Sequence, residues 1–178
     1  VVHNTQEISA EIIEKFRKVE SKSGNEAIVI SCIGGIRFFE QFRKVISYFK
    51  NDPRYILRFI GYGADVLKSY CDENNVENVI LHDRFPPDQT LDFYYDTDII
   101  LNLYGNNTPL LDYALSNKLY YAAQLGKPIL VCKDTYMEEV AVLNGFGFTV
   151  DLENREDLDN LYNYYHEINW IEFYKKCD

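Results

Sequence analysis

The sequence predicts an α/β fold of the Rossmann-like, doubly wound class, with a parallel sheet of about six strands and helices on both faces. Short apolar runs alternate with amphipathic, helix-like segments over most of the chain. The runs are rich in Val, Ile, Leu and aromatic residues, which is typical of buried parallel strands. The 178 residues, 47% hydrophobic and 26% charged, suit one domain with one core.

The predicted elements follow one another along the chain. Strands are expected at 27–33, 55–60, 78–82, 98–103, 128–132 and 147–150. Helices are expected at 38–50, 65–73, 90–95, 117–125 and 137–143. Two further amphipathic segments, 7–20 and 158–168, should pack as helices against this core. The aromatic tail, 170–174, should either cap the core or face a partner lobe.

We divide the chain into a linker with a packing helix, 1–25, and a Rossmann-like domain, 26–178. The chain begins without methionine or a signal peptide, so we expect a piece of a longer protein. No run of about 20 apolar residues is present, and therefore no transmembrane segment is expected.

Charge and cysteine content exclude several classes of protein. The net charge of −10, from 28 acidic against 18 basic residues, argues against nucleic acid binding, and any phosphate must be held by a few placed donors. Four cysteines lie far apart without a Cys-x-x-Cys pair, which predicts neither a zinc site nor a disulfide framework. This cysteine usage favours a reducing, cytoplasmic setting.

A glycine pair followed by an arginine comes directly after the first predicted strand. Gly35 would let the backbone approach a ligand, and Arg37 could offer two parallel hydrogen bonds to a diphosphate at the start of the next helix. The alternative is a tight turn with a solvated arginine, because the third glycine of a dinucleotide fingerprint is absent.

The loops after the second and third strands are weaker candidates for nucleotide contacts. Gly61 and Gly63 would permit a close approach of the backbone, although a plain loop explains them equally. Asp83 and Arg84 begin a segment that two prolines hold extended, where it could frame a nucleobase. We interpret His82 as a structural hydrogen-bonding residue at a strand end rather than as a general base.

The loop after the fourth strand is polar and irregular. Asn106, Asn107 and Thr108 carry amide and hydroxyl groups suited to hydrogen bonds with sugar hydroxyls. Asp96 and Asp98 precede that strand, away from the expected ligand edge, so we expect turn or capping roles for them and no catalysis.

The helix predicted at 117–125 begins with a phosphate-binding pattern. Ser116 is its expected N-cap, which places Asn117 and Lys118 in the first turn beside free backbone N–H groups. A lysine at this end opposes the helix dipole unless an anion lies nearby or the side chain is solvated. Asn117 and Lys118 are therefore candidates for diphosphate binding.

Taken in order, these motifs form a longer pattern. Its pieces are Ile33-Gly34-Gly35-Ile36-Arg37, Phe59-Ile60-Gly61-Tyr62-Gly63, residues 79–84, Tyr94-Tyr95-Asp96-Thr97-Asp98-Ile99 and residues 117–128. Over about residues 26–150 this ordered set resembles the C-terminal, donor-binding domain of GT-B glycosyltransferases, in the group 1, family 4-like class that includes capsule and lipopolysaccharide enzymes.

The resemblance implies that this lobe binds a nucleoside diphosphate sugar and that an N-terminal lobe holds a glycan or lipid-linked acceptor. It implies no cofactor and no metal, because Arg37, Lys118 and a helix end would neutralise the diphosphate leaving group. Two glutamates of the family fall on Tyr121 and near Tyr113 in this chain. We place Tyr121 among the nucleotide contacts and assign no catalytic residue within this piece.

The expected whole protein is then a glycosyltransferase of polysaccharide biosynthesis, transferring a hexosyl or related group, whereas this piece alone should be inactive. A cytoplasmic location is expected, with peripheral association of the full-length protein at the inner face of the cell membrane. Two alternatives stay open. The tyrosines at the glutamate positions, Tyr113 and Tyr121, suit a non-catalytic nucleotide-binding or partner module of the same fold. The other alternative is a lobe of a nucleotide-sugar epimerase.

Overall fold

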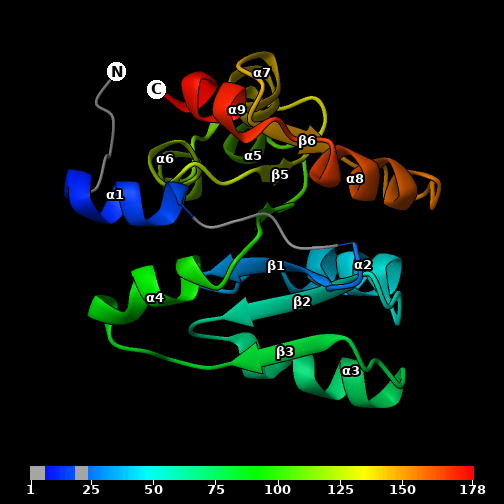
Figure 1. Cartoon of the computed structure of the whole chain (residues 1–178). Coiled ribbons are helices and arrows are strands. Elements are labelled where there is room, and N and C mark those ends of the chain that lie inside the picture. Colours follow the sequence, from blue (N-terminus) through cyan, green and yellow to red (C-terminus); the bar gives the residue numbers. More distant parts are fainter. Residues whose placement is uncertain (1–6, 19–23) are drawn as a thin grey trace.

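A six-stranded, fully parallel sheet forms the centre of the protein (Figure 1). The structure is a computed structural model that describes residues 7–18 and 24–178. The sheet has the order β3-β2-β1-β4-β5-β6. Its strands are β1 (Ile28–Ile33), β2 (Tyr55–Ile60), β3 (Val79–His82), β4 (Ile99–Asn102), β5 (Ile129–Val131) and β6 (Gly147–Thr149). All six predicted strands are confirmed, and so is the doubly wound Rossmann-like class.

The strand order reverses between β1 and β4, which lie side by side at the middle of the sheet. β1 pairs with β2 from Ile28 opposite Tyr55, and with β4 from Ile30 opposite Ile99. The chain runs outward from β1 in one direction and outward from β4 in the other. In open parallel sheets, ligands bind beyond the carboxyl ends of the strands at such a reversal.

Helices cover both faces of the sheet. They are α1 (Ala10–Arg17), α2 (Phe39–Phe49), α3 (Lys68–Glu73), α4 (Thr90–Tyr95), α5 (Pro109–Tyr113), α6 (Asn117–Leu125), α7 (Tyr136–Leu143), α8 (Asp157–His166) and α9 (Trp170–Cys177), with 3₁₀ turns η1 (Ala64–Leu67) and η2 (Pro87–Gln89). The predicted helices are present, and the segment predicted as one helix at 65–73 consists of η1 and α3. Helix α5 is an addition, because no helix was predicted for its residues.

Two apolar cores lie on opposite faces of the sheet, as alternate side chains of each strand demand. On β1, Ile30 joins the first core and Ile33 the second, while on β4 Leu101 and Ile100 divide in the same way. Helices α2 and α8 cover the first core. Helices α1, α4, α6, α7 and α9 cover the second.

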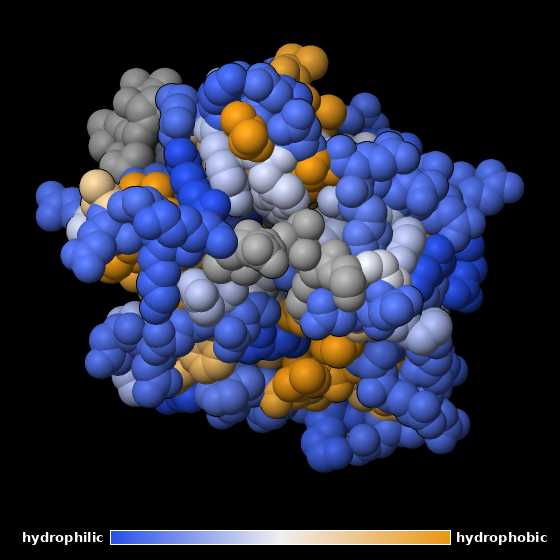
Figure 2. Space-filling model, in the orientation of Figure 1, coloured by the Kyte–Doolittle hydropathy of each residue, from blue (hydrophilic) through white to orange (hydrophobic). Residues whose placement is uncertain are grey.

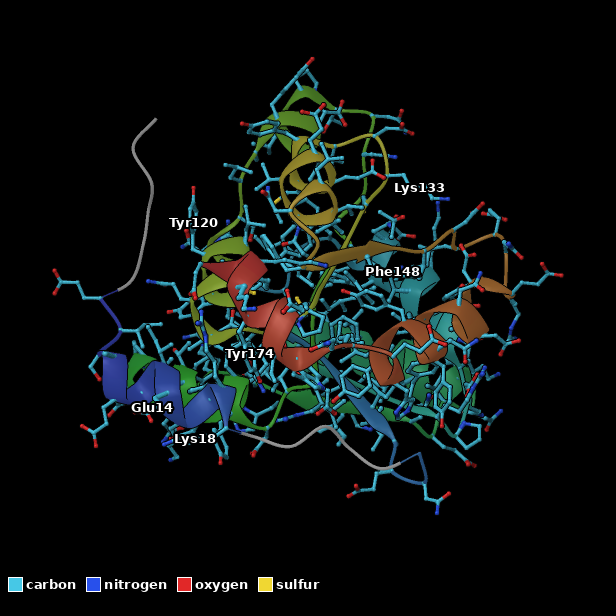
Figure 3. All side chains as sticks on the ribbon, turned by 45° about the horizontal axis from the view of Figure 1, so that its top comes forward. Glu14, Lys18, Tyr120, Lys133, Phe148 and Tyr174 are labelled. Atoms are coloured by element: carbon cyan, nitrogen blue, oxygen red, sulfur yellow. The ribbon has the colours of Figure 1, made fainter. Side chains whose placement is uncertain are left out.

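The first and last helices pack together at the edge of the second core. Arg17 of α1 pairs with Asp178 at 2.8 Å between Nη2 and Oδ1, and it also donates to the carbonyl of Ala123 on α6. Phe173 of α9 is buried, so the aromatic tail caps the core, as one of the two predicted alternatives has it. Figure 3 shows the exposed ion pair Glu14–Lys18 on α1 at the rim of the molecule. Residues 19–23, where the predicted helix 7–20 would end, lie outside the described residues.

The surface is mainly hydrophilic, with apolar residues gathered in small groups on the face that Figure 2 shows. Helices α5 and α7 carry the most exposed apolar side chains outside the tail, among them Leu110, Tyr113 and Leu143. Over the two described stretches, no helix is long and apolar enough to cross a membrane.

Candidate functional site

A cleft of about 400 Å³ opens where the loop after β1 meets the start of α6, at the reversal of strand order. The cleft is lined by Ile33, Gly34, Gly35, Arg37, Phe38, Phe85, Thr90, Tyr94, Tyr104, Ser116, Asn117, Lys118 and Tyr121. Its lining contains no Asp or Glu, although the chain has 28 of them. An anion in this cleft therefore meets no acidic side chain on its walls.

The loop after β1, which lines the cleft, is in direct backbone contact with the loop after β2. Gly34 donates its N–H to the carbonyl of Ile60, and the loop of Gly61 lies directly against it. Gly61 has φ of +136°, and a Cβ at this position would lie 1.9 Å from the carbonyl oxygen of Gly34. Only glycine fits both the backbone angle and the space. Gly61 therefore fixes how the loop after β1 sits above the sheet.

Two lysines are buried among the residues that the structure describes, each only 7% exposed, and their partners differ. Lys127 donates from Nζ to the carbonyl of Thr97 at 2.6 Å and to that of Tyr95 at 3.4 Å. Lys118 Nζ lies 5.2 Å from the ring centre of Tyr104, and it would lie 3.6 Å from a Cβ added to Gly34. Among the described residues, no carboxylate lies within salt-bridge distance of this ammonium group.

The environment of Lys118, little exposed and without a described carboxylate partner, favours an anion beside it. Buried charges in proteins are nearly always paired, because removal from water is expensive. Lys127 is paired with backbone carbonyls and is explained by structure alone. Lys118 instead lines the cleft at the start of α6. There the side chain of the N-cap, Ser116, accepts from the backbone N–H of Lys118. The lysine, the helix end and the acid-free walls together suit an anion.

Tyrosines complete the walls without adding charge. Tyr94 and Tyr121 stack with ring centres 4.5 Å apart, and burial raises the pKa of both hydroxyls. Burial also raises the pKa of Tyr104, with a further contribution from the nearby buried thiol of Cys32. These phenols stay neutral at physiological pH and leave the positive charge of Lys118 undiminished.

A second hollow of about 350 Å³ adjoins the cleft on the side of β2 and β3. The two share Gly34, Gly35, Phe85 and Thr90, and the second hollow adds Gly61, Tyr62, Arg84 and Pro87. The guanidinium of Arg84 lies 4.5 Å from the ring centre of Tyr62. Both hollows therefore offer cationic side chains together with aromatic rings.

The structure brings together most of the residues predicted for phosphate and nucleotide contacts. Gly35, Arg37, Asn117, Lys118 and Tyr121 line the cleft. The second hollow contains Gly61 and Arg84. Whether these residues bind a nucleotide stays a prediction.

Two predicted nucleotide contacts lie outside both hollows. A Cβ on Gly63 would lie 2.5 Å from the carbonyl oxygen of Ile36, so packing alone explains this glycine. Asp83 is exposed, and its carbonyl lies 2.8 Å from Nδ1 of His82, which gives that histidine the structural bond expected for it.

The predicted sugar-binding loop uses its polar groups internally. Asn106 donates to the carbonyl of Lys133, and its Oδ1 accepts from the side-chain amide of Asn107. Asn107 has φ of +65° and donates its N–H to Asp112. Thr108 is the N-cap of α5 and accepts from the N–H of Leu111. These three residues line neither hollow, and the bonds give each of them a structural role.

Phe38, Tyr104, Thr90 and the aromatic walls of the cleft were not predicted, since aromatic residues near strand ends are equally typical of a core. Helix α5 was not predicted either, although its sequence carries a helix-start signal. Threonine followed by proline is a typical helix start, with Thr108 as N-cap and Pro109 in the first turn. Asp98 was read correctly, because it accepts from the N–H of Val29 and from the hydroxyl of Tyr165 at the far end of the sheet.

Comparison with known proteins identifies the fold. The sequence matches no protein-family model and no curated protein sequence. Solved structures do match, among them WaaG, a glycosyltransferase involved in lipopolysaccharide biosynthesis, with a TM-score of 0.62 and 13% identity over 96% of this chain. Alr3699/HepE from Anabaena, in complex with UDP and glucose, gives 0.61 and 15% over 96%. Sucrose-phosphate synthase from Thermosynechococcus elongatus gives 0.60 and 13% over 95%.

The chain has the fold of one GT-B glycosyltransferase lobe. This GT-B lobe spans 46% of WaaG, 46% of HepE and 43% of the sucrose-phosphate synthase, which is less than half of each. Within the described part of the GT-B lobe, no group of three or more His, Cys, Asp or Glu side chains is placed to hold a metal ion.

Proposed function

We propose that this lobe binds the nucleoside diphosphate of a sugar donor and that the whole protein transfers the sugar to an acceptor. The observation that carries this proposal is Lys118, a residue only 7% exposed that lines an acid-free cleft at the start of α6. A diphosphate supplies the negative charge that the described side chains do not bring to this lysine. The GT-B fold supports the assignment, because one similar structure, HepE, holds UDP and glucose.

In this proposal the diphosphate lies against Lys118, Arg37 and the N–H groups at the start of α6. These groups stabilise the charge that grows on the leaving diphosphate as its bond to the sugar breaks. The adjoining hollow, with Tyr62, Arg84 and Phe85, takes the nucleoside. The chemistry on this side of the reaction is electrostatic and positional, and a general base for an inverting reaction comes from a second lobe.

The finer parts of the proposal concern the whole protein. We propose a glycan or lipid-linked acceptor on a second lobe, a role in polysaccharide biosynthesis of the capsule or lipopolysaccharide type, and a cytoplasmic location at the inner face of the membrane. The likeness to WaaG supports the lipopolysaccharide type at the level of fold. The spread of cysteines without disulfide spacing supports the reducing compartment.

Calorimetric titration of this chain with UDP, GDP, ADP and CMP, without and with magnesium, tests the proposal. One nucleoside diphosphate should bind saturably at a single site, and magnesium should not be required, because cationic side chains already face the diphosphate. UDP is the first nucleotide to test, in view of the HepE complex. If none of the four binds, the proposed function is wrong.

A second candidate is a non-catalytic nucleotide-binding module of the same fold. Tyr121 favours it, because this side chain stacks on Tyr94 where the resembling family has a glutamate. Sugar transfer by the full-length protein decides between the two candidates. Nucleotide binding without transfer by the intact protein would support the module. An epimerase needs acid and base groups in its cleft, and the lining of this cleft contains no Asp, Glu or His to supply them.

A further inference from the structure

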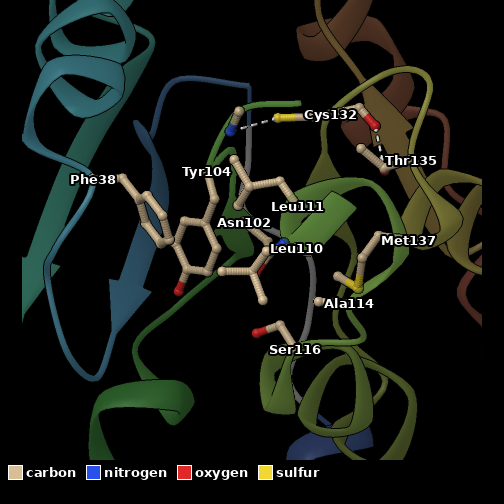
Figure 4. Close-up of a pocket in the computed structure, with 11 residues that line it drawn as sticks. Phe38, Asn102, Tyr104, Leu110, Leu111, Ala114, Ser116, Cys132, Thr135 and Met137 are labelled. Carbon is tan, nitrogen blue, oxygen red and sulfur yellow. Dashed lines mark hydrogen bonds between the residues drawn. The ribbon is translucent and has the colours of Figure 1, made fainter. Parts of the chain in front are cut away.

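An apolar pocket of about 250 Å³ lies beside the cleft, beyond the carboxyl ends of β4 and β5 (Figure 4). Residues of α5, α7 and the strand ends form its wall, which is lined by Phe38, Asn102, Tyr104, Gly105, Leu110, Leu111, Ala114, Ser116, Cys132, Thr135 and Met137. Phe38, Tyr104 and Ser116 also line the cleft, so the two spaces adjoin. The pocket is large enough for a substituent of a ligand held in the cleft.

One buried side-chain acceptor in this wall has no donor among the described residues. Asn102 is the last residue of β4 and only 6% exposed, and its Oδ1 accepts no hydrogen bond from any described residue. The polar groups of Ser116 and Thr135 are already engaged, by the N–H of Lys118 and by the carbonyl of Cys132. A buried amide oxygen without a donor is costly, and native proteins rarely keep one without a reason.

The chemistry of the pocket selects its ligand. The ligand group must be mostly apolar, because Leu110, Leu111, Ala114 and Met137 offer it no polar atom. It must also carry one N–H or O–H donor for Asn102. A bare hexose face presents several hydroxyls and would leave them unsatisfied here. An N-acyl-amino group satisfies both demands, because it combines one N–H with an alkyl end.

We propose that this pocket holds the N-acyl-amino group of the donor sugar, with Asn102 Oδ1 accepting its N–H and the side chains of Leu111 and Met137 contacting its alkyl part. This inference rests on the nucleoside diphosphate site proposed above. It assigns to the lobe a preference for N-acylated over plain hexosyl donors. The donor is favoured over the acceptor because the pocket shares three wall residues with the diphosphate cleft.

Met137 is a built-in reporter for the test, since it is the only methionine of the sequence and lines the pocket. Labelling methionine methyl groups with carbon-13 gives one protein signal from the pocket. UDP-N-acetylglucosamine or UDP-N-acetylgalactosamine should shift this signal saturably, whereas UDP and UDP-glucose should leave it nearly unchanged. In calorimetry, at least one N-acetylated donor should bind about tenfold more tightly than UDP-glucose. Equal affinity with an unmoved Met137 signal overturns the proposal.

The variant Asn102→Leu removes the acceptor while keeping a similar volume. Its unfolding midpoint without ligand should be unchanged or higher, because no described group donates to the lost oxygen. Its affinity for UDP should be unchanged, and the tenfold preference for the N-acetylated donor should disappear. Asn163→Leu, at an exposed position on α8, is the matched control and should keep the preference. A preference that survives in Asn102→Leu contradicts the role of Asn102.

Two further arms separate the possible failures. Methyl 2-acetamido-2-deoxyglucoside, added with whichever nucleotide binds, tests the pocket without a covalent donor link. If this free glycoside shifts Met137 and the N-acetylated nucleotide sugars do not, the pocket belongs to the acceptor and the donor assignment is wrong. If nucleotides bind but neither kind of acetamido sugar moves Met137, this inference fails while the proposed function stands. Absence of any nucleotide binding, by contrast, removes the proposed function and this inference together.

Discussion

Replacing Lys118 by methionine separates the binding role of this lysine from its packing role. Methionine keeps the unbranched apolar stem but removes the charge and the N–H donors. Lys118 is only 7% exposed, lines the cleft and precedes Leu119 of the second core. We therefore expect Lys118→Met to fold normally and to lose affinity for the nucleoside diphosphate.

The magnitude follows from the burial of the side chain. A hydrogen bond to a charged group contributes about 1.5–3 kcal/mol, and exposed charges give the lower part of such ranges because solvent and salt screen them. Lys118 is 7% exposed and its stem is already ordered, so we expect about 2–3 kcal/mol. This energy corresponds to a roughly 30- to 150-fold increase in the dissociation constant. Arg37 is exposed, and Arg37→Ala should weaken binding by only about 2- to 12-fold.

Calorimetry with the nucleotide that binds measures both variants, with Lys44→Met as the matched control at an exposed position on α2. Urea unfolding of the free proteins provides the second measurement. Removing a buried charge that no described carboxylate balances should leave the free energy of unfolding of Lys118→Met equal to the wild-type value, or raise it by up to about 1 kcal/mol. Two results would refute this reasoning. One is an unchanged affinity in Lys118→Met, and the other is a larger loss in Arg37→Ala than in Lys118→Met.

Three further variants and conditions test the fold around the cleft. Gly61→Ala should lower the free energy of unfolding by more than about 3 kcal/mol, because the added Cβ overlaps the loop after β1. In Gly35→Ala the added Cβ meets only the flexible end of Arg37 at 3.4 Å, so the free energy of unfolding should change by no more than about 0.5 kcal/mol. Similar urea midpoints for the two variants would contradict the overlap. Lys127→Met should lose about 2–4 kcal/mol of stability, since two backbone carbonyls lose a charged donor, and a thermal melt equal to wild type would show that these bonds contribute nothing. Burial raises the pKa of the Cys32 thiol in the folded protein, so its contribution to stability is complete below about pH 8.5 and declines as the pH rises further, by at most about 1.4 kcal/mol per pH unit; urea unfolding between pH 7.5 and 10 should show this decline, with a smaller slope in Cys32→Ala.

The sequence predicted the sheet well because buried parallel strands are continuous apolar runs, here short and rich in β-branched and aromatic residues. The start of α6 was equally predictable, since the Ser116 side chain accepts from the backbone N–H of Lys118, two residues further along. Local signals of this kind depend on residues a few positions apart. The position of Lys118 in the cleft then follows from the topology, because the carboxyl ends of β1 and β4 meet at one edge.

Other features could not be predicted because they depend on partners distant in the sequence. Asn106 has the same side chain whether it binds a sugar or the carbonyl of Lys133, and only the fold shows that it bonds to Lys133. Gly63 is explained by the carbonyl of Ile36, on another loop. Asn102 reads as one polar residue in an apolar strand, and its lack of a donor depends on every neighbour packed around it. The sequence cannot show which polar groups the fold leaves unsatisfied.

The contact between Gly61 and the loop after β1 determines how the cleft responds to a ligand. Because the two backbones touch, with Gly34 also bonded to Ile60, direct contacts hold this loop in place beside the cleft. Binding then requires little ordering of the backbone, and the entropic penalty falls mainly on exposed side chains such as Arg37, at about 0.5–1.5 kcal/mol for each one immobilised. Preorganisation of this kind makes the two cations unequal. Lys118 contributes nearly its full interaction energy to binding. The contribution of Arg37 is smaller, because its side chain loses conformational entropy when the ligand immobilises it.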